Sequence, residues 1–308
     1  MKMVSTRDAY GNAIAELGDK YDFYVFDADL AAATKTNIFK KKFPERFFDS
    51  GIAEADMMGM AAGFATCGAT VVASSFAMFA AGRAYEQVRN SIAYPHLNVK
   101  ICATHAGLLI GPDGGSHQCI EDISLMRTIP GMVVLCPSDA VQAPACVEAA
   151  LKYDGPCYLR FGRNPSPALY ETAEFEIGKG YQVREGGDIT IIAMGDMVYE
   201  SVLAADKLKE QGVNARVIDM PSIKPIDRDI IVKAAKETGV IVTAEDHNII
   251  GGLGSAVCEV TSELCPVPVH RVGVSDVFGR SGEKKELSEL YGLTAENIAK
   301  VCLEGLKK

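Results

Sequence analysis

The sequence lacks several features that would each point to a particular class of protein. It contains no apolar run that approaches the roughly 18 to 20 residues of a membrane-spanning helix. It also lacks a basic surplus, because 31 Lys and Arg stand against 40 Asp and Glu and give a formal net charge of -9. Nucleic acids and anionic membranes normally require a basic surface. We therefore expect a protein that binds neither nucleic acid nor membrane.

The start of the chain and its cysteines indicate a cytoplasmic location. The N-terminus opens at once into a polar, helix-like segment rather than an apolar leader. The nine cysteines are odd in number, form no CxxC pair and lie in apolar runs such as those that end at Cys102 and Cys136. This distribution is typical of buried, reduced thiols rather than of disulfides or metal ligands.

Length and patterning predict two α/β domains. A chain of 308 residues, 48% hydrophobic and 23% charged, is long enough for two hydrophobic cores. Short β-rich runs alternate with amphipathic segments, which predicts two three-layer domains, each with a mostly parallel sheet flanked by helices. A polar stretch separates them, so we expect one domain over residues 1–165, a linker over 166–187 and a second domain over 188–308.

The expected elements follow from hydrophobic periodicity and helix caps. In the first domain we expect strands at 23–26, 70–74, 99–104, 132–136 and 157–161, and helices at 6–19, 54–66, 80–94, 117–128 and 139–153. In the second we expect strands at 188–193, 215–220, 240–245 and 267–272, and helices at 197–211, 229–238, 254–264 and 294–306. Asp139 is a candidate N-cap for its helix.

The most informative segment runs from Gly51 to Gly63. Glu54 begins a helix of small residues in which Gly59 and Gly63 lie one turn apart on one face. Small residues at this spacing let another helix or a flat ligand approach closely, and a carboxylate at a mostly apolar helix start needs a partner. On spacing alone, stabilisation of Glu54 by the helix dipole is the alternative.

Two further groups of residues follow predicted strands. Phe76 and Phe79 are three residues apart, a spacing more typical of core packing than of a cofactor pocket. His105, Asp113 and His117 lie in a Gly-rich loop after a strand, where α/β sheets place ligand-binding groups. Their spacings of eight and four residues match no standard zinc pattern. Metal ligation and ordinary loop polarity are the alternatives to a substrate site.

The sequence Gly-Ile-Ala-Glu54, followed by a Gly-rich helix, resembles the pyrimidine-binding domain of thiamine-diphosphate enzymes. The resemblance implies that Glu54 hydrogen-bonds N1′ of the aminopyrimidine and favours the imino tautomer, which removes the C2 proton of the thiazolium ring. It also implies that Phe76 and Phe79 clasp the aminopyrimidine ring and that Asp29 lies near the thiamine. A third aromatic residue that transketolases often carry would fall at Gly82 and is absent.

The pattern T-H-x(7)-D-G-x-x-H-Q that contains His105, Asp113 and His117 is similar to that of transketolase and deoxyxylulose-phosphate synthase. The resemblance implies that His105 contacts the sugar phosphate, that Asp113 reads an α-hydroxyl of the substrate, and that His117 stabilises charge on the substrate-derived intermediate. Glu54, His105 and His117 are then the expected catalytic residues.

A phosphorylated substrate needs arginine contacts in so acidic a protein. Arg7 matches a transketolase arginine near the domain start. A later strand end matches a second one, for which we favour Arg160 over Arg163. A phosphate-contacting serine of the family is replaced by Ala33, with Thr34 adjacent.

The Gly-Asp-Gly motif with a downstream Asn, which holds the metal and diphosphate in thiamine enzymes, does not occur here. We therefore expect no metal ligand in this chain. The resemblance covers nearly the whole chain and implies the pyrimidine-binding and C-terminal domains of a split transketolase. An N-terminal transketolase subunit would be its partner, holding the diphosphate of thiamine diphosphate and a divalent cation, Mg or Ca, in an α2β2 assembly.

We therefore predict transfer of a two-carbon ketol unit from a ketose phosphate to an aldose phosphate, in the pentose phosphate pathway and only with the partner. One alternative is the β chain of a 2-oxo-acid dehydrogenase E1, which shares the layout but is not expected to carry the His105, Asp113 and His117 series. Others are a deoxyxylulose-phosphate synthase, normally one chain, and a non-catalytic homologue or nucleotide-binding module.

Overall fold

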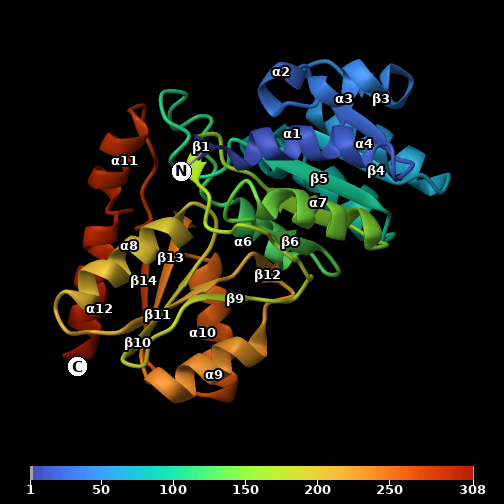
Figure 1. Ribbon diagram of the computed structural model, residues 1–308. Coiled ribbons are helices and arrows are strands. Elements are labelled where there is room, and N and C mark those ends of the chain that lie inside the picture. The colour runs from blue at the N-terminus through green and yellow to red at the C-terminus, as the bar shows by residue number, and fades with distance from the viewer. Residues whose placement is uncertain (1–2, 308) are drawn as a thin grey trace.

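The computed structural model describes residues 3–307, which form two α/β domains, at the upper right and lower left of Figure 1. The first domain has a seven-stranded sheet in the order β12-β6-β7-β5-β4-β2-β3. Its strands are β2 (Tyr24–Asp27), β3 (Phe47–Asp49), β4 (Val71–Phe76), β5 (Val99–Thr104), β6 (Val133–Leu135), β7 (Cys157–Arg160) and β12 (Ser222–Lys224). Only β12 is antiparallel to its neighbour, so the predicted mostly parallel sheet is confirmed.

Helices cover both faces of this sheet because the strands are apolar on both sides. On one face α1 (Thr6–Leu17), α3 (Asn37–Lys42) and α7 (Gln142–Lys152) pack around Tyr10 and Phe39. On the other face α4 (Glu54–Thr66), the π-helix η2 (Met78–Arg83) and α6 (Asp122–Thr128) pack around Met57 and Ile123. The short helices α2 (Ala31–Thr34), η1 (Pro44–Arg46), α5 (Tyr85–Gln87) and η3 (Val88–Ala93) complete the domain.

The second domain repeats this three-layer arrangement on a five-stranded sheet in the order β14-β13-β10-β11-β9. Its strands are β9 (Tyr181–Arg184), β10 (Ile189–Ala193), β11 (Ala215–Asp219), β13 (Ile241–Asn248) and β14 (Val269–Val274), and β9 alone is antiparallel to its neighbour. Its helices are α8 (Met197–Lys209), α9 (Arg228–Thr238), α10 (Leu253–Leu264), α11 (Lys284–Tyr291) and α12 (Ala295–Leu306). The predicted fold class is therefore confirmed.

The segment expected to be a linker takes part in both domains. Strand β8 (Ser166–Pro167) pairs with β1 (Met3–Val4) at the start of the chain, whereas β9 joins the second sheet. In the opposite direction, β12 leaves the second half of the chain and pairs with β6. Met220 and Ile223 next to this crossing belong to the same buried core as Met57. The domains are therefore packed on each other, and the exact boundaries stay a prediction.

Most predicted elements match the observed ones to within a few residues, and those at 54–66 and 99–104 coincide with α4 and β5. The helix expected from Asp139 is α7, which begins only at Gln142 with Val141 at its N-cap position, although Asp139 Oδ1 accepts the amide hydrogen of Gln142 at 2.7 Å. The helix expected over 117–128 is wrong in its first part, because α6 begins only at Asp122. Gly107 pairs there with Cys119 in an isolated bridge, which holds the preceding residues as a loop. The elements α2, α3, β3 and α11 were not predicted.

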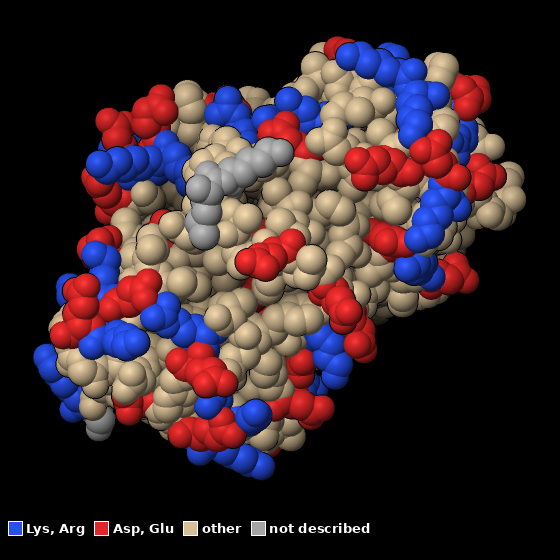
Figure 2. Space-filling view, in the orientation of Figure 1, with Lys and Arg blue, Asp and Glu red and all other residues tan. Residues whose placement is uncertain are grey.

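Two observations concern the surface and the membrane. No helix among residues 3–307 is long and apolar enough to cross a bilayer. On the face shown in Figure 2, blue and red side chains are interspersed and do not gather into one basic area.

All nine cysteines are free thiols and six of them are buried, as predicted for structural thiols.

Candidate active site

The predicted site residues follow the carboxyl ends of neighbouring parallel strands, so the sheet brings them to one edge (Figure 1). Asp29 follows β2, Phe76 ends β4, His105 follows β5 and Arg163 follows β7. The register pairs Phe76 with Thr104, the residue before His105. The rings of Phe76 and His105 therefore lie next to each other at the ends of adjacent strands. This edge is where open α/β sheets bind ligands.

Glu54 is buried, with 1% of its surface exposed, at the first position of α4. A buried carboxylate needs a partner, and that partner is Arg83, whose Nη1 donates to Glu54 Oε2 at 2.7 Å. The dipole of α4 adds to this stabilisation, so the two interpretations of Glu54 are compatible. Because Arg83 engages only Oε2, the second carboxylate oxygen is available to a ligand.

Arg83 is a site residue that the sequence did not reveal. Its guanidinium lies 4.5 Å from the centroid of the Phe79 ring, in a cation–π contact, while it binds Glu54. The π-helix η2 makes both contacts possible, because the wider turn bonds Ala84 N to Phe79 O, five residues back. A π-turn leaves no periodic signal, although an arginine so soon after two aromatic residues could have been noted.

Phe76, Phe79, His105 and His117 form one aromatic cluster. The ring of Phe76 stacks on that of His105 at 3.8 Å between centroids and on Phe79 at 6.0 Å. The ring of His117 meets Phe79 edge to face at 5.3 Å. The phenylalanines therefore contact the predicted substrate loop directly. At Gly82, where a third aromatic was expected, a side chain would collide with the Cε methyl of Met78.

His105 is held as a neutral imidazole. It is 3% exposed, and burial together with the nearby Arg7 and Arg163 lowers its pKa to about 3. Arg7 Nη1 lies 3.3 Å from Nε2, and a guanidinium can only donate, so Nε2 accepts and Nδ1 carries the proton toward Thr104 Oγ1 at 3.0 Å. The residue has a φ of 55°, a strained conformation for histidine that is typical of functional positions.

The two candidate phosphate-binding arginines lie at the end of β7 and in the loop after it. Arg160 is 5% exposed and its donors are used internally: Nε binds Asp122 Oδ2 at 2.8 Å and Nη2 binds the carbonyl oxygen of Asp246 at 2.9 Å. Arg163 is half-buried, with Nε 3.9 Å from Asp113 Oδ2. Arg163 therefore lies beside Asp113 in the loop after β7, whereas Arg160 lies inside the junction of the domains, and which of the two contacts a phosphate stays a prediction.

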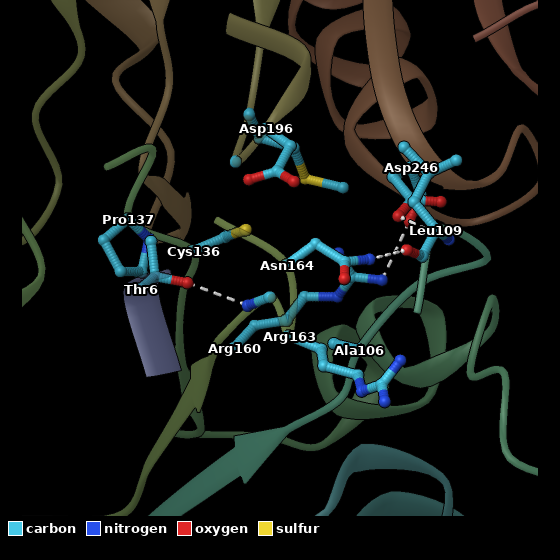
Figure 3. Close-up of a pocket in the computed structure, with 13 residues that line it drawn as sticks. Thr6, Ala106, Leu109, Cys136, Pro137, Arg160, Arg163, Asn164, Asp196 and Asp246 are labelled. Atoms are coloured by element: carbon cyan, nitrogen blue, oxygen red, sulfur yellow. Dashed lines mark hydrogen bonds between the residues drawn. The ribbon is translucent and has the colours of Figure 1, made fainter. Parts of the chain in front are cut away.

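Arg160 instead stands where the two domains meet. Figure 3 shows the narrow pocket there, lined by Arg160, Arg163 and Asn164 from the first domain and by Asp196 and Asp246 from the second. The hydroxyl of Tyr158 also donates to Asp122 Oδ2, at 2.8 Å, the same oxygen that Arg160 binds. This buried network joins the domains and has a structural role.

Breaking this pair is expected to destabilise the protein. Arg160→Met leaves the Asp122 carboxylate buried without its counter-charge, and removing one partner of a buried ion pair typically costs about 3–5 kcal/mol. The free energy of unfolding in urea measures this loss. The control Arg228→Met removes an exposed pair with Glu263 and is expected to cost less than about 1 kcal/mol. Equal losses in the two variants would contradict a structural role for Arg160.

The second domain holds the loop that carries Asp113 and His117. Gln118 Nε2 donates to the carbonyl oxygens of Leu108 and Arg280, each at 2.9 Å. Asp246 accepts the amide hydrogen of Leu108 at 2.8 Å. A side chain at Gly279 would collide with Gln118, so the glycine allows this close approach. The position of the substrate loop thus depends on both domains.

A cavity adjoins Phe79 of the aromatic cluster. It has a volume of about 510 Å³ and is lined among others by Phe79, Arg83, Gln118 and the highly exposed Phe278. Within residues 3–307, no three His, Cys, Asp or Glu side chains are grouped so as to hold a metal ion.

Asp29 and Ala33 lie at the β2 end of the same edge. The Asp29 side chain is exposed, its φ is 60°, and its amide hydrogen is bound by Asp49 Oδ1 at 3.1 Å. Its role near the thiamine stays a prediction. Ala33 has no polar group, and the adjacent Thr34 donates to the buried Asp27 at 2.7 Å, so neither side chain supplies the expected hydroxyl.

Comparison with known proteins places these observations in a family. Residues 2–167 match the transketolase pyrimidine binding domain, and residues 178–298 match the transketolase C-terminal domain. A Methanocaldococcus jannaschii protein named as a transketolase C-terminal section is 51% identical over 98% of this chain and 96% of its own. The 6-deoxy-6-sulfo-D-fructose transketolase subunit SqwH of Clostridium sp. strain MSTE9 is 44% identical, over 97% of this chain and 93% of its own.

A solved structure agrees with these matches. It is described as a split gene transketolase in an inactive beta4 tetramer, and it is 50% identical with a TM-score of 0.92, over 99% of both chains. The resemblance inferred from Glu54 and the His105 loop is thus confirmed along the whole chain. Two matching domains and relatives of equal length show that this chain belongs to the transketolase family, as a split subunit made of the pyrimidine-binding and C-terminal domains.

Proposed function

We propose that this chain is the pyrimidine-binding subunit of a transketolase that moves a two-carbon ketol unit between sugar phosphates. The observation that carries the proposal is the placement of a buried carboxylate, two stacked phenylalanines and two histidines at one sheet edge. Thiamine diphosphate, when bound, supplies the carbon nucleophile for this chemistry. Glu54 orients its aminopyrimidine and shares a proton with the ring nitrogen, while Phe76 and Phe79 contact the ring and Asp29 lies near it.

The substrate would occupy the neighbouring loop and its cations. The terminal phosphate would be contacted by His105, Arg7 and Arg163, with Arg163 proposed in place of Arg160. Arg7 and Arg163 lie close enough to the neutral imidazole of His105 to lower its pKa. His117 would stabilise charge on the reacting sugar. A relative named for a sulfo-sugar supports an anionic substrate end but leaves the preferred sugar open.

The partner we propose is an N-terminal transketolase subunit that binds the diphosphate through a divalent cation, in an α2β2 assembly. The pentose phosphate pathway and a cytoplasmic location complete the proposal. It is tested by assaying the co-purified chains with a ketose phosphate and an aldose phosphate, and in parallel with a 2-oxo acid. Ketol transfer supports the proposal, whereas turnover of the 2-oxo acid alone indicates the E1 β alternative.

Asp113→Ala is expected to relax selectivity more than it lowers turnover. A polar group that reads a substrate hydroxyl discriminates through the cost of leaving that group unpaired, about 1–3 kcal/mol. Discrimination between acceptor aldoses of opposite C2 configuration should therefore fall about 10-fold to 100-fold. The measurement is the ratio of kcat/KM values. The exposed Asp154 precedes β7 at the opposite edge, so Asp154→Ala is the control. An unchanged ratio in Asp113→Ala would rule out the proposed role.

A further inference from the structure

Lys35 is displayed by a loop that is fixed on both sides. Thr34 and Thr36 each donate a hydroxyl hydrogen to Oδ2 of the buried Asp27, at 2.7 and 2.8 Å. The amide hydrogen of Leu30 binds the other oxygen of this carboxylate at 2.7 Å. The residue between the threonines has a φ of 72°, which costs energy for any side chain other than glycine. The hydrogen bonds to Asp27 thus hold the loop on both sides of Lys35, whose side chain stays partly exposed.

Helix α1 has a matching feature. A Cβ atom at Gly11 would collide with the Cβ of Lys35 and lie 2.8 Å from its carbonyl oxygen, so the glycine lets the loop reach the helix. This approach brings the Lys35 ammonium within 3.1 Å of Asp8 Oδ1. Asp8 directly follows Arg7, whose guanidinium contacts His105. Lys35, which directly follows α2, therefore joins the charges at the substrate edge from a different segment than Arg7 on α1 and Arg163 after β7.

The charges in this group favour an anion. Arg7, Lys35 and Arg163 all lower the pKa of His105 through their positive charge, in addition to its burial. Their only carboxylate partners among the contacts of the described residues are Asp8 and Asp113. Arg7, Lys35 and Arg163 thus place three cations around the neutral His105, in a protein whose formal net charge is -9. The Lys35 side chain remains about one-third exposed and can therefore reach a ligand.

We propose that Lys35 is a substrate-binding residue of this site, whose ammonium binds the terminal phosphate of the sugar together with Arg7, Arg163 and His105. This inference rests on the proposed function. Lys35 would take the place of the hydroxyl that Ala33 and Thr34 do not supply, and would exchange its contact with Asp8 for the phosphate. A cation in place of a hydroxyl makes the site select for charge, because it raises affinity for an anionic end over a neutral one.

The test is Lys35→Met in the assembled enzyme, with Lys41→Met as the control because Lys41 is an exposed lysine on the nearby α3. KM for a phosphorylated acceptor should rise about 10-fold to 100-fold, the range expected for a hydrogen bond to a charged group. With the ketose phosphate donor at saturation, the KM for unphosphorylated glycolaldehyde should change much less, and Lys35→Arg should restore part of the affinity. Equal effects on both acceptors, or none, would overturn the proposal.

A second measurement separates this inference from the proposed function. Inorganic phosphate should raise the melting temperature of the wild-type complex and of Lys41→Met, and should raise that of Lys35→Met much less. This readout needs no ketol transfer, so it tests the anion contact even if the complex has another activity. An equal response of Lys35→Met and wild type to phosphate would show that Lys35 binds no anion, whatever the outcome of the activity assay.

Discussion

Glu54→Gln is expected to preserve the fold and reduce turnover of the assembled enzyme by about 10²- to 10⁴-fold, the usual contribution of a positioned acid–base group. The carboxylate is buried at the start of α4, where it can share a proton with a ring nitrogen of the cofactor. An amide of the same shape keeps one acceptor oxygen for Arg83 but cannot drive the same tautomer shift. The measurement is kcat with a ketose phosphate donor and an aldose phosphate acceptor.

Asp56→Asn is the matched control for this experiment. Asp56 lies in the same first turn of α4, but its side chain is exposed. The substitution Asp56→Asn removes the same charge as Glu54→Gln. Circular dichroism and co-purification with the partner establish that both variants fold and assemble. If purified Glu54→Gln complex turned over at the wild-type rate, or if Asp56→Asn lost as much activity, the assignment of Glu54 would be wrong.

The isolated chain is expected to show no ketol transfer, and activity should appear only when the N-terminal subunit is added. Within residues 3–307 no carboxylate cluster is grouped so as to hold a metal that would bind a diphosphate. The protein's negative charge opposes a highly charged anion further. The solved split gene transketolase that is covered over 99% of its length is described as an inactive beta4 tetramer.

Calorimetry with thiamine diphosphate and Mg²⁺ measures this dependence. The single chain should release little heat, whereas the mixture should bind and become more stable, by about 2.7 kcal/mol when the ligand is at 100 times its Kd. Assembly and cofactor binding should therefore strengthen each other. The Glu54→Gln chain, mixed with the same partner, controls for assembly without turnover. Micromolar binding and turnover by this chain alone would show a diphosphate site within it and would exclude the split-enzyme proposal.

The sequence by itself determined the class of fold and the segments that form the site. Strands such as β6 are apolar and buried throughout, so their pattern reports burial directly, whereas the small-residue spacing of α4 does not, because Gly59 and Gly63 are exposed with no neighbour. Glu54, Phe76, His105 and His117 were recognisable because residue type and local order sufficed. Phe76 and His105 also follow predicted strands, which already places these two residues at one edge of a parallel sheet.

The tertiary structure decided which partners these residues have. Arg83 pairs with Glu54 across 29 positions, through a π-turn that no sequence period announces. Arg160 at the end of β7 binds the second domain, Arg163 in the following loop lies beside Asp113, and Gly11 lets the loop of Lys35 approach α1. Periodicity records whether a side chain is buried, whereas strand order, loop conformation and the docking of the domains decide against what it is buried.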